Sequence, residues 1–184
     1  MKCSTLLAVA LLLPIGLPAQ DVGPKVGDLA PDFTLPAATM AGVAAQPVQL
    51  SALRGRTVVL AFFPRARTSG CTIQMKAYRD QYPELFNGGK DVSLFAISTD
   101  SASALASWAM DEKFPFTFLS DAGKTAGPLY ATLREGGSSE SRVAFVIGKD
   151  GKIAKIFRPF REVDATAYTE LKEAVGAARS AKPH

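Results

Sequence analysis

Residues 57–63 constrain the fold most, because they read Thr-Val-Val-Leu-Ala-Phe-Phe, a nearly unbroken apolar run rich in strand-forming residues. A strand with apolar side chains on both faces has to be covered on both faces, as at the centre of a sheet between two layers. Residues 72–81 have helical character, so the chain passes from this strand to a helix through a short loop. The sequence therefore predicts an α/β fold organised around this strand.

Further strand and helix patterns follow along the chain. Strands are expected at 33–35, 48–50, 57–63, 92–98, 116–119, 142–147 and 153–157, with a hairpin turn at 149–152 and a loop at 37–46. Helices are expected at 71–86, with a kink or a new start at Pro83, and at 101–112, 123–130 and 165–178. This order predicts a central mixed β-sheet flanked by α-helices.

Residues 1–19 have the pattern of a secretory signal peptide. Lys2 supplies a positive end, residues 6–17 form an apolar run, and Ala19 is a plausible cleavage point. The run is too short to span a bilayer, which makes an uncleaved anchor the weaker alternative. We expect a protein exported to a bacterial periplasm or secreted, with residues 20–184 forming a single domain and no membrane association after cleavage.

Cysteine usage and charge narrow the function classes. The chain has two cysteines, Cys3 and Cys71, and cleavage of the signal would leave Cys71 alone, without a partner for an internal disulfide. A leftover thiol in an oxidising compartment is a candidate reactive group. The formal net charge of +4 includes no basic block, so no nucleic-acid partner is expected.

Cys71 lies where the loop after the strand meets the start of the helix. The first turn of a helix has unpaired N–H groups and a partial positive charge, and both favour thiolate over thiol. Thr68 places a hydroxyl one short turn before the sulfur, and Gly70 allows close approach to the backbone. Free cysteines are also commonly inert buried residues, but the small and polar neighbours of Cys71 favour a reactive thiol.

The spacing Pro64-x-x-x-Thr68-x-x-Cys71 resembles the active-site motif of the peroxiredoxins. Residues 27–36, Gly-Asp-Leu-Ala-Pro-Asp-Phe-Thr-Leu-Pro, and residues 141–147, Ser-Arg-Val-Ala-Phe-Val-Ile, resemble further segments of that family in the same order. The subgroup with the greatest resemblance is the bacterioferritin-comigratory, or Q-type, peroxiredoxins. The resemblance implies a thioredoxin-like fold.

The resemblance also implies a thiol-dependent peroxidase that reduces hydrogen peroxide or organic hydroperoxides. Cys71 would attack the peroxide and become a sulfenic acid. Thr68 would position the substrate, Pro64 would shield the thiolate, and Arg142 would place a fixed positive charge beside the sulfur. No cofactor or metal is implied. The partners would be the peroxide and an external thiol or thioredoxin-like reductant, and the protein would be a monomer or a homodimer.

Three positions depart from the pattern of the family. Lys76 stands where many Q-type members have a second cysteine, which removes resolution within the chain. Gln74 replaces the usual glutamate and Ala144 the usual threonine, and both changes are expected to weaken the hydrogen bonds that hold Thr68 and Arg142. The oxidised sulfur is expected to be vulnerable to further oxidation until an external thiol reduces it.

Two other function classes stay open at this point. One is a non-catalytic exported redoxin that acts as a binding or assembly protein. The other is a copper chaperone, since Cys71 and Met75 are soft ligands one helical turn apart, although it lacks the second cysteine and the histidine expected at such a site. A disulfide oxidoreductase is a weaker alternative still, because the chain contains no Cys-x-x-Cys.

Overall fold

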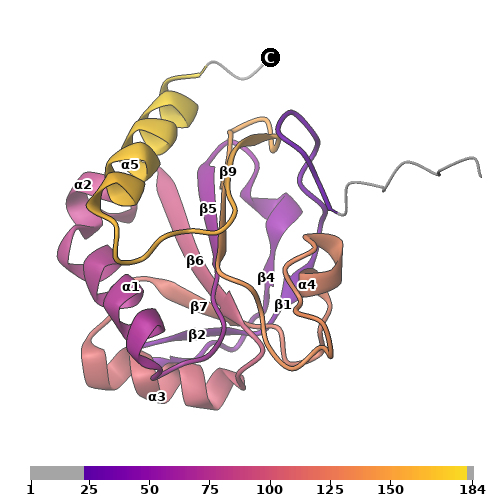
Figure 1. The fold of residues 1–184 in the computed structure, drawn as a ribbon, viewed down its shortest axis with the longest axis vertical. Helices are drawn as coiled ribbons and strands as arrows, with labels where there is room; N and C mark the ends of the chain where they lie inside the picture. Colours follow the sequence, from indigo (N-terminus) through magenta and orange to yellow (C-terminus); the bar gives the residue numbers. More distant parts are fainter. Residues whose placement is uncertain (1–22, 182–184) are drawn as a thin grey trace, which may run out of the picture.

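The computed structural model describes residues 23–181, so the predicted signal peptide at 1–19 lies outside the described residues. Its strands are β1 (Thr34–Leu35), β2 (Ala37–Thr39), β3 (Gly42–Val43), β4 (Val48–Gln49), β5 (Thr57–Phe62), β6 (Val92–Ser98), β7 (Thr117–Ser120), β8 (Val143–Ile147) and β9 (Ile153–Phe157). Its helices are α1 (Ser69–Asp80), α2 (Tyr82–Phe86), α3 (Ala102–Glu112), α4 (Ala126–Leu129) and α5 (Ala165–Ser180), with 3₁₀ turns at Leu50–Leu53 and Asn87–Gly89 (Figure 1).

The seven-stranded sheet has the order β3-β2-β7-β6-β5-β8-β9. Strand β5 lies inside it, parallel to β6 and antiparallel to β8, and all of its residues are buried. Val58, Leu60 and Phe62 belong to one core cluster. Val59 and Ala61 belong to the other, because successive side chains of a strand point to opposite faces. The prediction of a central strand covered on both faces is confirmed.

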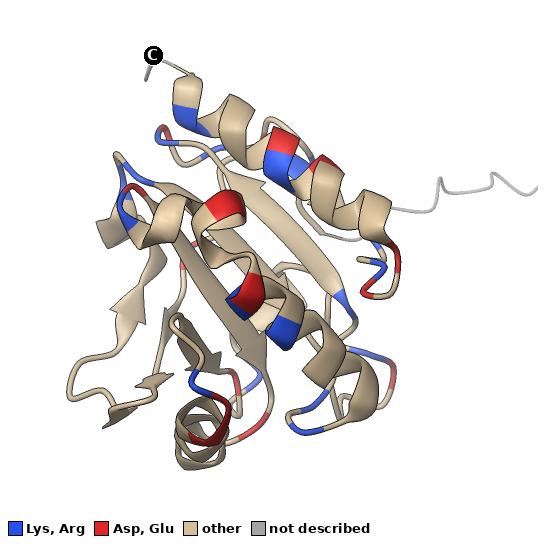
Figure 2. Ribbon diagram, turned by 90° about the vertical axis from the view of Figure 1, so that its left-hand side faces the viewer, with Lys and Arg blue, Asp and Glu red and all other residues tan. Residues whose placement is uncertain are grey.

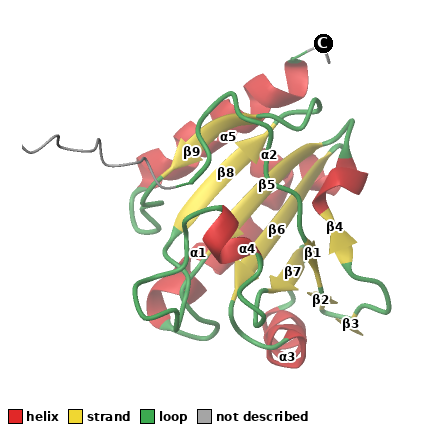
Figure 3. Cartoon of the chain, turned by 90° about the vertical axis from the view of Figure 1, so that its right-hand side faces the viewer, coloured by secondary structure: helices red, strands yellow, loops and turns green. Residues whose placement is uncertain are grey.

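Helices cover the two faces of this sheet unequally. Residues of α1, α2, α3 and α5 share one core cluster with one face of the sheet. Residues of α4 and of the β1–β4 pair share the other cluster with the opposite face. Figure 3 shows α4 in front of the sheet and α1, α2 and α5 behind it. The predicted mixed β-sheet flanked by α-helices is therefore confirmed.

The loop expected at residues 37–46 is wrong, because this segment forms the β2–β3 hairpin. Strand β2 pairs with β7 on one side and with the edge strand β3 on the other, and Gly42, which opens β3 after the turn, has a φ of 119°. Ala37 and Ala38 are buried there. Their small side chains allow close packing beneath α3, and strand pairing of this kind depends on the neighbours rather than on local propensity.

The helix expected from Cys71 to Phe86 is two helices in the structure. Helix α1 begins at Ser69 and ends at Asp80, and α2 begins at Tyr82 with Pro83 in its first turn. Proline fits a first turn because its missing N–H needs no partner there, so Pro83 marks a new start rather than a kink. The last helix also runs two residues further than predicted, to Ser180.

Charged residues of both signs alternate over the helical face of the molecule. Figure 2 shows Lys and Arg interspersed with Asp and Glu along the helices of that face. Among residues 23–181, no helix combines the length and the apolar character that a bilayer span requires.

Candidate active site

Cys71 is the third residue of α1, directly after the loop that leaves β5. Thr68 is the residue that precedes the helix, and its carbonyl accepts the N–H of Thr72 at 2.8 Å. The N–H groups of Ser69, Gly70 and Cys71, in the first turn before Thr72, have no partner inside the helix, and this favours an anion at the sulfur. The side chain of Cys71 is 0% exposed, so the sulfur is shielded from solvent in the described state.

The loop before α1 is held by hydrogen bonds to the end of β6. The N–H of Ala66 donates to Asp100 Oδ2 at 2.8 Å, and the hydroxyl of Ser98 donates to the same oxygen at 2.9 Å. The Thr68 hydroxyl donates to the Arg65 carbonyl at 3.0 Å. Pro64, which opens this loop, is partly buried. Thr68 Oγ1 therefore keeps lone pairs that can accept a hydrogen bond from a substrate.

Arg142 lies beside Cys71, as the resemblance implied. Its Nη2 is 3.5 Å from Cys71 Sγ, and its side chain is 13% exposed. The sheet register explains this proximity, since Phe62 at the end of β5 pairs with Val143 at the start of β8. The residue that precedes Val143 therefore lies at the edge where the chain leaves β5 and begins α1.

A second nitrogen of the Arg142 guanidinium, Nη1, joins a hydrogen-bonded chain of side chains from α1. Nη1 donates to Gln74 Oε1 at 2.5 Å, and Gln74 Nε2 donates to the Tyr78 hydroxyl at 2.9 Å. Burial raises the pKa of Tyr78 above its usual value, so this hydroxyl stays protonated. Gln74, expected to weaken the network, takes part in it as a hydrogen-bond acceptor for Arg142.

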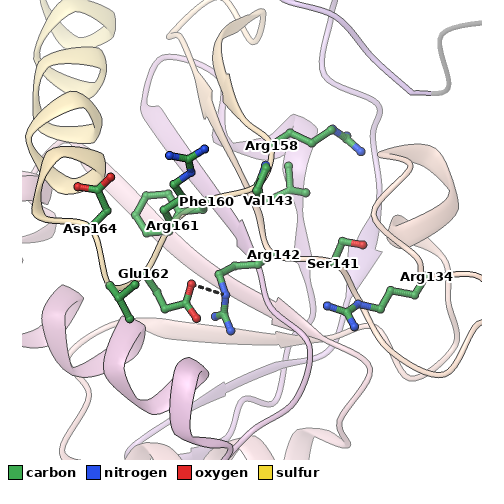
Figure 4. Close-up of a pocket in the computed structure, with 11 residues that line it drawn as sticks. Arg134, Ser141, Arg142, Val143, Arg158, Phe160, Arg161, Glu162 and Asp164 are labelled. Carbon is green, nitrogen blue, oxygen red and sulfur yellow. Dashed lines mark ion pairs between the residues drawn. The ribbon is translucent and has the colours of Figure 1, made fainter.

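Glu162 is a member of this site that sequence reasoning missed. Its Oε2 lies 3.1 Å from Arg142 Nε, and Figure 4 shows the two side chains pointing toward one another. The main-chain carbonyl of Glu162 accepts the Tyr168 hydroxyl at 2.8 Å. Burial, with Glu162 adding to the effect, raises the pKa of Tyr168 to about 12. Glu162 belongs to the loop between β9 and α5, where the sequence has no motif to single it out.

A groove of about 890 Å³ borders this site on the side of β8 and the loop before α5 (Figure 4). Arg142 and Glu162 line it together with Arg134, Ser141 and Arg161. Cys71 is not among its lining residues. Arg142 thus lines the groove and also contacts the sulfur of Cys71.

Gly70 leaves the space in which Glu162 and Arg142 meet. A Cβ at this position would lie 2.7 Å from Glu162 Oε1 and 3.0 Å from Arg142 Nη2. Both atoms end flexible side chains, so we expect Gly70→Ala to keep the fold and displace the guanidinium. Displacements of about 1 Å can cost roughly 100-fold in rate, and we expect a loss of at least about tenfold in peroxide reduction. Stopped-flow kinetics measure it, and a parental rate would show that Gly70 is not needed here.

The copper-chaperone alternative has no support in this geometry. Cys71 and Met75 are both 0% exposed and belong to the same core cluster. Among residues 23–181, no group of three or more His, Cys, Asp or Glu side chains could hold a metal ion.

Comparisons with known proteins decide the family. Residues 26–156 match the model of the AhpC/TSA family. The chain belongs to this family. Peroxiredoxin Bcp of Escherichia coli is 35% identical over 143 residues, which cover 74% of this chain and 87% of that protein. Chloroplastic peroxiredoxin Q of Sedum lineare is 33% identical over 138 residues, covering 72% of this chain and 73% of that protein.

Solved structures agree with the AhpC/TSA assignment. Peroxidoxin BcpB of Mycobacterium tuberculosis has a TM-score of 0.71 at 31% identity, covering 85% of this chain and 99% of that one. A cysteine-to-serine mutant of PrxQ from Xylella fastidiosa, at 20% identity, shares the fold with a TM-score of 0.70 and covers 84% and 98% of the two chains. The predicted peroxiredoxin family, thioredoxin-like fold and thiol-dependent peroxidase are confirmed, and no finding supports the non-catalytic alternative.

Proposed function

We propose that Cys71 is the peroxidatic residue of this peroxidase, that it reduces hydrogen peroxide or organic hydroperoxides, and that an external thiol recycles it. The observation that carries the proposal is the 3.5 Å contact of Arg142 Nη2 with Cys71 Sγ in the first turn of α1. A guanidinium and a helix start together favour the thiolate, which is the nucleophilic form of cysteine.

In the first step, the Cys71 thiolate attacks one oxygen of the peroxide. A sulfur–oxygen bond forms, the oxygen–oxygen bond breaks, and the second oxygen leaves with the electron pair of that bond and takes a proton as water or an alcohol. The sulfur is oxidised to sulfenic acid and the peroxide is reduced by two electrons. Negative charge moves from sulfur to the leaving oxygen, so fixed donors beside both atoms lower the barrier.

The surrounding residues supply those donors. Arg142 is charged at every physiological pH and stabilises both the thiolate and the departing oxygen. The Thr68 hydroxyl both accepts and donates hydrogen bonds, which suits a substrate with two oxygens to align. Pro64 carries no N–H and shields the thiolate from water. These roles use all four residues that the sequence singled out.

In the second step, an external thiol or thioredoxin-like reductant attacks the sulfenic sulfur and releases water, leaving a mixed disulfide. A second thiol then displaces Cys71 as a thiol and leaves with the first as a disulfide. Because Cys71 is 0% exposed in the described state, the peroxide and the reductant both reach the sulfur only after residues around the first turn of α1 move, and the bulkier reductant needs the larger movement. This scheme applies equally to a monomer and a homodimer.

Sulfenic acid should persist when no reductant is present. We expect limiting peroxide to produce a species trapped by a sulfenic-acid reagent on a monomer in non-reducing gels, because Cys71 is the one cysteine between residues 20 and 184. Cys71→Ser should give no trapped product. A disulfide dimer that forms rapidly and almost completely would contradict the external-thiol scheme and place the resolving thiol on a second copy.

Export is the second part of the proposal, supported by the charged end, apolar run and Ala19 of the leader. We expect the protein from its native host to begin near Gln20 and to be found in the periplasm or outside the cell. Intact-mass measurement of each cell fraction checks this. A full-length chain in the cytosol would contradict export and would return Cys3 to the list of candidate resolving thiols.

A further inference from the structure

We propose that Glu162 is a positioning residue for the peroxidase, which holds the Arg142 guanidinium against Cys71 with a carboxylate supplied from the loop before α5. The part of this inference that concerns rate rests on the proposed function; the part that concerns the sulfur's charge state does not. Glu162 touches neither the sulfur nor, in the proposed reaction, the peroxide. Its effect reaches both through Arg142.

The three nitrogens of the guanidinium have three different partners. Nη2 faces Cys71 Sγ at 3.5 Å, Nη1 donates to Gln74 Oε1 at 2.5 Å, and Nε lies 3.1 Å from Glu162 Oε2. Among these partners Glu162 is the carboxylate, whereas Gln74 is a neutral amide. The hydrogen bond to Gln74 is charge-assisted through the guanidinium alone, whereas Glu162 brings the opposite charge and adds Coulombic attraction. Glu162 therefore holds the guanidinium from the Nε side, which Gln74 does not reach.

Burial and packing keep this ion pair in place. The side chain of Arg142 is 13% exposed and that of Glu162 is 22% exposed, so water screens their attraction less than at an open surface. The Tyr168 hydroxyl holds residue 162 through its main-chain carbonyl, which no side-chain substitution removes. Gly70 leaves room for both side chains. Replacing the Glu162 side chain should therefore spare the loop itself.

If Glu162 had a different role, neutralising Arg142, its removal would change the thiolate fraction of Cys71 in the opposite direction. If the carboxylate acted only by neutralising Arg142, its removal would leave more positive charge near Cys71 and raise the thiolate fraction. If it positions Arg142, its removal lets the guanidinium turn away and the thiolate fraction falls. The direction of the change therefore separates the two roles without any measurement of turnover.

The experiment compares Glu162→Gln with the parent and with Glu170→Gln, which removes an exposed carboxylate of α5 outside the site. In Glu162→Gln we expect a lower thiolate fraction at neutral pH, measured by ultraviolet absorbance. We also expect about a tenfold lower rate constant with hydrogen peroxide, the effect of losing one charge-assisted contact. The thermal midpoint should stay within the range set by Glu170→Gln.

A compensating substitution then gives Arg142 a new carboxylate partner, at Nη1 instead of Nε. Gln74 already meets Arg142 Nη1 at 2.5 Å, so Gln74→Glu combined with Glu162→Gln places the anion on the same group. The Tyr78 hydroxyl, which now accepts from Gln74, can turn to donate to the new carboxylate. We expect the double variant to recover the thiolate fraction and to return to within about threefold of the parental rate.

Two results would overturn the positioning role. One is a parental or higher thiolate fraction in Glu162→Gln. The other is a loss that Gln74→Glu does not recover and that comes with a lower thermal midpoint, which would make Glu162 a structural residue. If the parent itself reduces no peroxide while Glu162→Gln still lowers the thiolate fraction and Gln74→Glu restores it, the proposed function fails and the positioning of Arg142 by Glu162 stands.

Discussion

Arg142→Gln is expected to lower the rate constant for peroxide reduction roughly 100- to 1,000-fold, the range seen when one preorganised donor is removed from an oxyanion hole. The substitution removes the positive charge that lies 3.5 Å from Cys71 Sγ and also the ion pair with Glu162. The thiolate and the departing oxygen both lose their nearest charged donor. Stopped-flow kinetics with hydrogen peroxide measure the loss, with circular dichroism confirming that the fold is retained.

Two matched variants isolate the cause. Arg161→Gln removes an arginine of the same groove whose side chain points away from Arg142 in Figure 4, and it should keep the parental rate. Arg142→Lys keeps a positive charge but loses the planar guanidinium that contacts Gln74 and Glu162 together. Its rate constant for peroxide reduction should therefore lie between those of Arg142→Gln and the parent. Parental kinetics in Arg142→Gln would remove Arg142 from the mechanism.

The order of the large elements could be predicted because their patterns are local. β5 and β6 are apolar on both faces, and the helix starts at Ser101 and Asp164 have side chains that accept the expected N–H bonds. The β2–β3 hairpin could not be predicted in this way. Its alanines have weak strand propensity, and its pairing with β7 is a tertiary contact between segments far apart in sequence.

The residues of the site also differ in whether local sequence or tertiary contacts place them. Pro64, Thr68 and Cys71 lie on one loop and one helix start, so their spacing is visible in the sequence. Arg142 was identified through a family resemblance, and its approach to the sulfur depends on the register of β5 against β8. The position of Glu162 beside Arg142 depends on how the loop before α5 packs over α1, and neither composition nor spacing predicts that packing.

Glu140 is expected to make the stability of the protein depend strongly on pH. It lies two residues before Arg142, is 0% exposed, and neither carboxylate oxygen has a hydrogen-bond partner among the described residues. Its carboxylate faces Gly127, where a Cβ would lie 2.5 Å from Oε1. The neighbouring Asp121 already accepts the N–H groups at the start of α4. Burial, with Asp121 adding to it, raises the pKa of Glu140 from 4.5 to about 7.

A raised pKa means that the folded chain binds the Glu140 proton more tightly than the unfolded chain does. The associated stability is therefore complete below pH 4.5, declines between pH 4.5 and about 7, and is absent above that range. One pKa unit corresponds to about 1.4 kcal/mol, so the free energy of unfolding should fall by up to about 3 kcal/mol across this window.

Glu140→Gln removes the titrating group while keeping its shape, so it should lose this part of the pH dependence. Urea unfolding of parent and variant between about pH 4 and pH 8 should show their difference in unfolding free energy changing by up to about 3 kcal/mol in favour of the variant. Glu135→Gln, an exposed change in the same loop, should run parallel to the parent. Equal slopes for the parent and Glu140→Gln would mean that Glu140 ionises in the folded protein as it does in the unfolded chain. A parental slope that is steeper by the expected amount would make ionised Glu140 a source of strain in the segment that leads directly into Arg142.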